Sequence, residues 1–153
     1  MKAHLAYLVY VLKHKWFVFY AGLYLQVPLW QLIIHDLSKF TPAEWPAYVR
    51  WFKTGDRSPE AKAAFDAAWE HHWLNNPHHW QYWAGDPPGA LLMPMPEKYL
   101  REMVADWCGA GRAISGKWDV LAWWRKNEGR VSMHHTTRDR VDRLVAEADQ
   151  VLR

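Results

Sequence analysis

Histidine and aspartate residues are grouped along this chain in a pattern that could bind metal ions. The chain has 153 residues with nine histidines and one cysteine. The candidate ligands fall in four places: His14, His35 with Asp36, the pairs His71-His72 and His78-His79, and Asp106. Imidazole and carboxylate groups hold divalent transition metals while leaving coordination positions open for water. The pattern therefore predicts a metal centre built from side chains far apart in the sequence.

Each of these residues, taken alone, also has a purely structural explanation. A histidine on an apolar helix face, such as His14, is more often a packed core group than a ligand. Asp106 is a stronger candidate, because an aspartate among apolar helix neighbours is rarely buried unless it is paired or metal-bound. The joint occurrence of the groups, rather than any single residue, favours a metal site.

About six to seven helices are predicted to position these side chains. Apolar residues at three- and four-residue steps, including Leu5, Leu12 and Trp16, indicate an amphipathic helix from His4 to about Ala21. Further helices are expected over about 28–36, 42–52, 58–74, 96–113, 119–126 and from a cap at Thr136 or Thr137 to 152. No segment alternates long enough to be a strand. The fold class is all-α, a compact single-domain bundle over residues 1–153.

Local signals place the candidate ligands on this scaffold. Thr41 and Glu44 have the spacing of a capping box, which predicts the start of the third helix. His35 and Asp36 are expected at the end of the second helix, about 100° apart around its axis. Pro77 breaks the helix after His72, so the later histidines must converge through a bend. A long loop is predicted over 85–89.

Composition and charge exclude several classes of protein. The formal net charge is only +3, and without a basic stripe it gives no specific nucleic-acid signal. A single cysteine excludes an internal disulfide framework and favours a cytoplasmic setting. The uncharged run 16–34 is long enough to span a bilayer, but Gln26, Pro28 and Gln31 argue against that, so no membrane partner is expected. Twelve tryptophans favour an aromatic core and make a homodimer plausible.

The grouped ligands also resemble a known superfamily. The order of His14, His35-Asp36, a later histidine pair and Ala105-Asp106 resembles the signature of the HD-domain superfamily of metal-dependent phosphohydrolases. Three runs more closely resemble a family of short HD-like proteins from bacteria and phages: His-Asp-Leu-Ser-Lys-Phe at 35–40, His-Trp-Leu-Asn-Asn-Pro-His-His-Trp at 72–80, and Glu-Met-Val-Ala-Asp-Trp at 102–107. The resemblance covers roughly residues 10–145.

The resemblance implies which residues hold the metal. It makes His14, His35, Asp36 and Asp106 the ligands of a first ion. Asp36 would bridge to a second ion, held by His72 and by His78 or His79, while His71 is expected at the surface or behind a ligand. The cofactor is thus one or two divalent ions, with Mn, Fe, Co and Zn all compatible with the donors.

The implied activity is hydrolysis of a small phosphorylated substrate, a phosphomonoester or a nucleotide, by metal-activated water. Lys39 is expected to bind a phosphoryl oxygen, Asp36 to hold the reacting centre, and Glu102 to orient a ligand or accept a proton. Two alternatives stay open. One is a di-iron oxygenase of the HD type, and the other is a non-catalytic, tryptophan-rich module that binds a partner protein and at most a structural ion.

Overall fold

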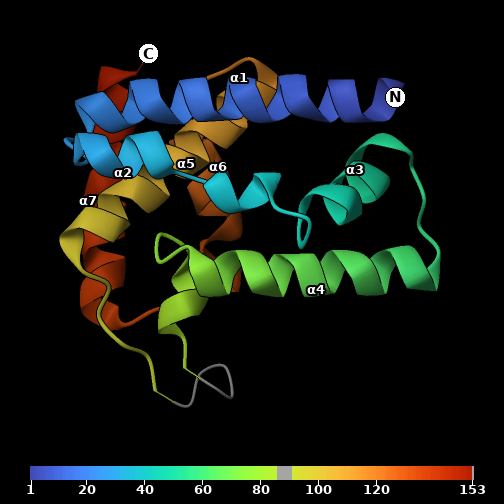
Figure 1. The fold of residues 1–153 in the computed structure, drawn as a ribbon. Helices are drawn as coiled ribbons and strands as arrows, with labels where there is room; N and C mark the ends of the chain where they lie inside the picture. Colours follow the sequence, from blue (N-terminus) through green and yellow to red (C-terminus); the bar gives the residue numbers. More distant parts are fainter. Residues whose placement is uncertain (86–90, 153) are drawn as a thin grey trace.

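The computed structural model describes residues 1–85 and 91–152, and within them it contains seven α-helices and no strand (Figure 1). The helices are α1 (Lys2–Tyr24), α2 (Leu29–Ile34), α3 (Trp45–Lys53), α4 (Pro59–Asn75), α5 (Glu97–Ser115), α6 (Val120–Asn127) and α7 (His135–Val151), joined by the short 3-10 helices η1 (Leu37–Phe40), η2 (Trp80–Trp83) and η3 (Glu128–Arg130). The predicted all-α fold is confirmed. Of the predicted loop, residues 86–89 lie outside the described residues.

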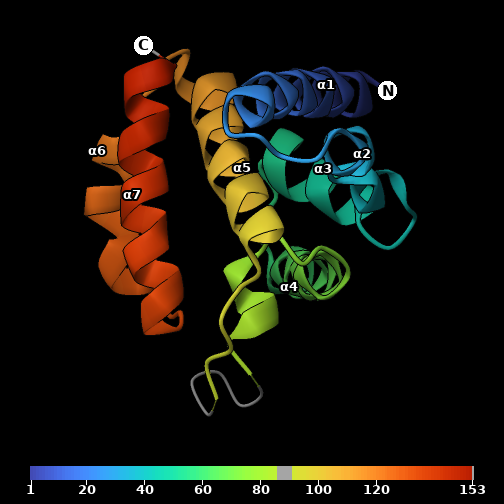
Figure 2. The ribbon, with the colours of Figure 1, turned by 90° about the vertical axis from the view of Figure 1, so that its left-hand side faces the viewer.

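Helix α5 runs through the middle of the molecule. Figure 2 shows α6 and α7 on one side of it and α1 to α4 on the other. Its Val104 and Ala105 are fully buried in the main apolar core, together with Val18 of α1 and Val141 of α7. Any polar side chain on the inner face of α5 therefore lies inside the protein, and Asp106 is such a residue.

Helix α1 connects this core to a second, smaller one. Tyr7 and Val11, in its N-terminal half, pack with Tyr48 and Val49 of α3 and with Ala68 of α4. The C-terminal half of α1 packs against α5 instead. The candidate metal centre lies where the two cores meet.

Close contact between α1 and α5 depends on a glycine. A Cβ atom added at Gly109 would lie 2.4 Å from Val18 Cγ2 and 2.6 Å from its backbone nitrogen. Because a backbone atom cannot yield as a flexible side chain can, we expect Gly109→Ala to lower the free energy of unfolding by about 3 kcal/mol, measured by urea titration.

Gly111→Ala in the same helix is the matched control. Its Cβ would meet only Asp119 Oδ1 at 3.5 Å, so it should not destabilise the protein. Equal losses from both variants would contradict this account.

Three of the local predictions were wrong. Thr41 and Glu44 form no capping box, because α3 begins at Trp45 and the Thr41 hydroxyl donates to the Ser38 carbonyl at 2.7 Å. The last helix is capped by His134, whose ring accepts from the Thr136 amide. The Thr137 hydroxyl instead accepts a hydrogen bond from the Met95 amide at 2.9 Å. Thr41 thus bonds within its own turn, whereas Thr137 bonds to a residue 42 positions away, so neither hydroxyl caps the predicted helix.

The third of these predictions concerns the faces of α1. Leu5, Leu12 and Trp16 were expected to face the core, but Leu5 is 63% and Trp16 65% accessible. Tyr7, Val11 and Val18 are buried instead. The helix is apolar on both sides, so spacing alone could not tell which side faces the core. The uncharged run is split between α1 and α2, as predicted, and among the described residues no helix has the length and apolarity to cross a membrane.

Candidate metal centre

Asp36 lies at the centre of the candidate site. Its side chain is fully buried, and its backbone has φ 58°, in the left-handed region. Helix α2 ends at Ile34, so His35 and Asp36 do not lie on a helix as predicted but form the turn into η1. Aspartate tolerates this conformation better than most residues, and such strain is concentrated at functional sites.

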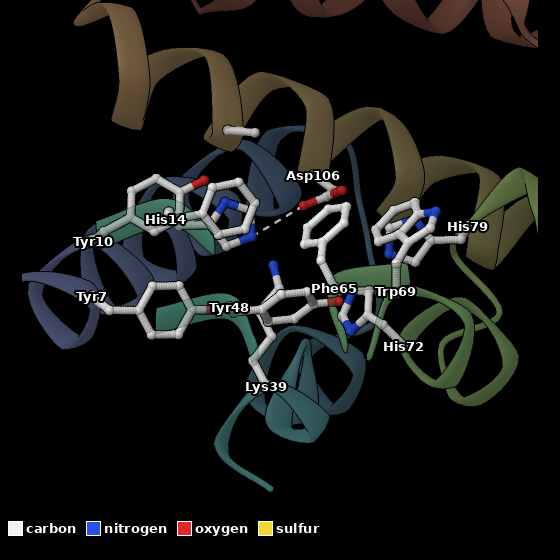
Figure 3. A pocket seen from close by; sticks show the side chains of 12 residues that line it. Tyr7, Tyr10, His14, Lys39, Tyr48, Phe65, Trp69, His72, His79 and Asp106 are labelled. Carbon is white, nitrogen blue, oxygen red and sulfur yellow. Dashed lines mark ion pairs between the residues drawn. The ribbon is translucent and has the colours of Figure 1, made fainter. Parts of the chain in front are cut away.

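A first group of ligands surrounds one oxygen of Asp36. His14 Nε2 lies 3.0 Å from Asp36 Oδ2 and 3.1 Å from Asp106 Oδ1, and Figure 3 shows the His14–Asp106 pair. His35 Nε2 lies 3.4 Å from both of these oxygens. One atom from each of the four residues falls within 4.8 Å of the others. The structure thus brings together side chains from α1, the α2–η1 turn and α5.

A second group surrounds the other oxygen. Asp36 Oδ1 lies 3.3 Å from His72 Nε2 and 3.5 Å from His78 Nε2, and His79 completes a set whose ligand atoms lie within 4.8 Å of one another. Helix α4 ends at Asn75, before Pro77, and the chain then bends back toward the site, as predicted. Both members of the 78–79 pair reach the site, so the choice between them does not arise.

Two buried glutamates hold the histidines in place from behind. Glu102 Oε1 lies 3.0 Å from His35 Nδ1 and 3.4 Å from His78 Nδ1. Glu44 Oε2 lies 2.8 Å from His72 Nδ1. A carboxylate at Nδ1 fixes the proton there and leaves the Nε2 lone pair free to bind a metal. The structure thus places Glu102 behind a histidine of each group, and Glu44 behind His72 of the second group.

The inward-facing nitrogen atoms of these histidines have the properties expected of metal ligands. Within residues 1–85 and 91–152, the buried side-chain atoms that make no hydrogen bond include Asp36 Oδ1 and the Nε2 atoms of His35, His72, His78 and His79. Buried polar atoms are nearly always satisfied in proteins. Four such nitrogen atoms around one carboxylate have the donor chemistry of a divalent transition metal, so the residues present fit the predicted ion.

Sequence reasoning missed Glu44. Its apparent role in a capping box gave it a local explanation, and its contact with His72 spans 28 positions. His71 lies on the other side of the same carboxylate, with Nδ1 2.9 Å from Glu44 Oε1 and a side chain 39% exposed. His71 thus has the position behind a ligand that the sequence predicted for it.

Electrostatics prepare the site for a cation. Burial opposes ionisation of Asp36 and Asp106, but neighbouring histidines, and Lys39 in the case of Asp36, hold both pKa values well below their usual range. Burial lowers the pKa of His78 and His79, and nearby histidines lower it further. Two charged carboxylates therefore face two neutral imidazoles at neutral pH.

Lys39 reaches into the same region from η1. Its Nζ lies 2.5 Å from Asp36 Oδ2, the oxygen that also faces His14. Burial opposes its charge, but Asp36 and Asp106 raise the pKa of the ammonium group above its usual value. Lys39 thus remains charged and balances these carboxylates, where its side chain points into a cavity (Figure 3).

That cavity opens onto one side of the centre. It has a volume of about 280 Å³, and His14, His72, His79, Asp106 and Lys39 line its polar part. Aromatic side chains form the rest of its wall: Tyr7, Tyr10, Tyr48, Phe52, Phe65 and Trp69. Candidate ligands from both groups are therefore accessible from a pocket that could admit a small substrate.

The positioning role of Glu44 can be tested by substitution. Glu44→Gln keeps the shape but weakens the hold on the His72 Nδ1 proton, so we expect metal affinity at the second group to fall about 10–100-fold while the first group is retained. Titration with Mn²⁺ or Zn²⁺, followed by calorimetry, measures both sites. Glu60→Gln, at an exposed position in the first turn of α4, is the control. Unchanged binding in Glu44→Gln would remove Glu44 from the site.

Metal binding is also expected to depend on pH. Burial opposes protonation of His35, but Asp36, Asp106 and Glu102 outweigh it and raise its pKa to about 9. Below that pH a proton must leave His35 before it can bind a metal, so affinity should fall by up to about tenfold per pH unit from pH 9 to pH 7. Calorimetry in two buffers of different ionisation enthalpy should show proton release at pH 7. Affinity independent of pH across this window would contradict the assignment of His35 as a ligand.

An all-α domain with a buried histidine–carboxylate centre is the class that fold and site define. The chain matches the model of a family described as a family of unknown function (DUF5662) over residues 3–147, and it belongs to that family. The matched range contains all of the candidate ligands. No curated protein and no solved structure gives a significant match to the chain.

Proposed function

We propose that this protein is a metal-dependent phosphohydrolase of the HD type, acting on small phosphomonoesters. The observation that carries the proposal is the convergence on Asp36 of buried imidazole nitrogens that make no hydrogen bond in the described part of the chain. They lie beside a cavity that contains one charged lysine. A divalent ion held by the two groups would supply Lewis-acid polarisation of a phosphoryl group and a water of lowered pKa.

The protein's own residues bind and orient the substrate. Lys39 Nζ can bind a phosphoryl oxygen at the inner end of the cavity and stabilise the charge that builds up there in the transition state. Glu102 and Glu44 keep the protons of His35 and His72 on Nδ1. The aromatic wall excludes water around the ester, which strengthens the contact with Lys39.

The same ligands would also suit a di-iron centre. The ammonium group of Lys39, beside the cavity, favours the phosphohydrolase, because it is complementary to an anionic phosphoryl group. The cavity disfavours a purely structural ion, since a structural site has a closed coordination shell. These two observations favour a phosphohydrolase over the oxygenase and over a non-catalytic module that holds a structural ion.

The proposal is tested by metal analysis and a substrate panel. Purified protein should contain one to two equivalents of divalent metal by elemental analysis and should release phosphate from simple phosphomonoesters when Mn²⁺ or Co²⁺ is supplied. A mixed-valent iron signal after anaerobic purification, with no phosphate release, would favour the oxygenase. Near-zero metal after growth and reconstitution with each ion would reject a metal centre altogether.

A further inference from the structure

The cavity beside the metal ligands is built for one phosphoryl group and an apolar ring. We infer that, among phosphomonoesters, this site selects those with a compact aromatic group over esters of sugars and polyols. This inference rests on the proposed function and names its substrate class. It is drawn from the side chains that line the cavity and from its size.

The polar end of the cavity provides for a single phosphate. Apart from histidines, Lys39 is the only cationic side chain among its described lining residues. No arginine from the described part of the chain is present to bind a second phosphate in the bidentate manner such groups need. A monophosphate matches this end better than a di- or triphosphate.

The remainder of the cavity has few groups that could form hydrogen bonds with a sugar. Six aromatic side chains form its wall, and one of its three phenol groups, that of Tyr48, already donates to the Ala68 carbonyl at 3.2 Å. No serine, threonine, asparagine or glutamine from the described residues lines it. A buried hydroxyl without a partner weakens binding about tenfold or more, so each unmatched sugar hydroxyl counts against that substrate.

The size of the cavity also favours a phosphomonoester with one aromatic ring. An engineered apolar cavity of about 150 Å³ holds a benzene ring, so a cavity of about 280 Å³ has room for one ring and a phosphoryl group. Ring-on-ring contacts with residues such as Phe65 and Trp69 would add favourable interactions beyond simple burial.

The test compares esters that share a primary alcohol leaving group. We expect kcat/KM for benzyl phosphate to exceed that for ribose 5-phosphate and glycerol 3-phosphate at least tenfold, with adenosine 5′-monophosphate between them. Equal rates, or a preference for the sugar esters, would overturn the inference. No phosphate release from any ester would reject the proposed function instead, and the two failures are therefore distinct.

Binding and substitution give independent measurements. The metal-loaded protein should bind benzylphosphonate at least tenfold more tightly than 2-hydroxyethylphosphonate by calorimetry, and equal affinities would overturn the inference. Phe65→Ala should lower the ratio of kcat/KM for benzyl phosphate to kcat/KM for ribose 5-phosphate. Phe52→Ala, at a side chain that is 51% exposed, gives the same test with little risk to folding. Phe17→Ala, outside the cavity, should leave the ratio of the two substrates unchanged, and a ratio unmoved by both Phe52→Ala and Phe65→Ala would also overturn the inference.

A second inference comes from the exposed face of α1, far from this chemistry. The apolar residues Leu5, Val9, Leu12, Trp16, Phe19 and Leu23, here called the α1 stripe, follow one another at steps of four and three. Leu5, Leu12, Trp16 and Leu23 are each more than half exposed and Val9 is 44% exposed. Phe19 is partly buried and packs against the main core. This alternation is the seam of a two-helix coiled coil. We propose that the α1 stripe pairs with the α1 stripe of a second copy of this chain.

The order of residues within the stripe favours a second copy over another partner. The stripe is symmetric in spacing about residue 14, so two copies related by a two-fold axis match along its whole length when the helices are antiparallel. Val9 then faces Phe19 of the second copy, and Leu12 faces Trp16. Both layers set a smaller aliphatic side chain against a large aromatic one, which lets the surfaces interdigitate.

The charges on α1 predict how this dimer responds to salt. The helix contains no acidic residue, and the exposed Lys13 flanks the stripe near its centre. The Lys15 ammonium group instead donates to the His35 carbonyl of the same chain. In the antiparallel pair Lys13 approaches Lys13 of the second copy, so added salt should screen their repulsion and strengthen the dimer. Adsorption of the same face to an anionic lipid surface would weaken with salt.

Sedimentation equilibrium tests the α1 pairing. We expect a dimer at micromolar concentration that dissociates in Trp16→Glu, with the helical circular dichroism unchanged because the position is exposed. Ile114→Glu, at another exposed apolar position, 75% accessible on α5, should remain a dimer. A monomeric wild-type protein, including one that binds vesicles of anionic phospholipid, would overturn the proposal, as would a dimer that Trp16→Glu leaves intact.

Discussion

Asp36→Asn is expected to abolish metal binding in both groups and to lower kcat/KM for phosphomonoesters at least about a thousandfold, or roughly 4 kcal/mol of transition-state stabilisation. The two oxygens of Asp36 face different ligand groups, His14 on one side and His72 on the other. Asparagine keeps the volume but removes the negative charge that both groups share. Elemental analysis and the ester assay measure the two losses separately.

The matched control for this substitution is Asp66→Asn. Asp66 is an exposed aspartate paired with Lys62 at 2.6 Å on α4, and surface pairs of this kind contribute little to stability. It should leave metal content and activity unchanged. If Asp36→Asn unfolded the protein without a separable loss of metal, the centre would be structural. Metal content equal to that of the wild type would remove Asp36 from the coordination sphere.

The helices of this fold were largely predictable because their signals are local. Ser58 and Pro59 mark the start of α4, and the Ser58 side chain does cap it, accepting from the Ala61 amide. Asp106 could be singled out because a charged residue amid apolar neighbours needs a special explanation. The histidine groups could be identified as candidate metal ligands because the types of residue and their order along the chain indicate metal binding before the fold is known.

What the sequence did not reveal depends on contacts between distant residues. Glu44 had a sufficient local explanation, and only the fold places it against His72. Helix α2 ends at Ile34, two residues before its predicted end, and Asp36 adopts a left-handed backbone. Periodicity cannot indicate such a turn. The exposed face of α1 was misassigned because an apolar stripe looks the same whether it packs on its own core or on another molecule.

Lys39→Met is expected to separate metal binding from catalysis. The Lys39 ammonium group lies 2.5 Å from Asp36 Oδ2, an oxygen that a metal of the first group would use. Removing the charge relieves that competition, so metal affinity should stay the same or rise. The phosphoryl group loses its cationic partner, and kcat/KM should fall about a hundredfold, the usual effect of losing one preorganised charge or donor.

Thermal unfolding supplies a readout for Lys39 that does not depend on activity. Without the ammonium group, Asp36 and Asp106 keep less compensation for their buried charge, so the metal-free variant should be less stable than the metal-free wild type. Metal then replaces the missing cation, and the rise in Tm on adding Mn²⁺ should be larger in Lys39→Met than in the wild type. Lys62→Met, at an exposed position, should match the wild type in both states. A smaller rise in Tm for Lys39→Met would mean that Lys39 supports the metal instead of competing with it, and its role would then be structural rather than directed at the substrate.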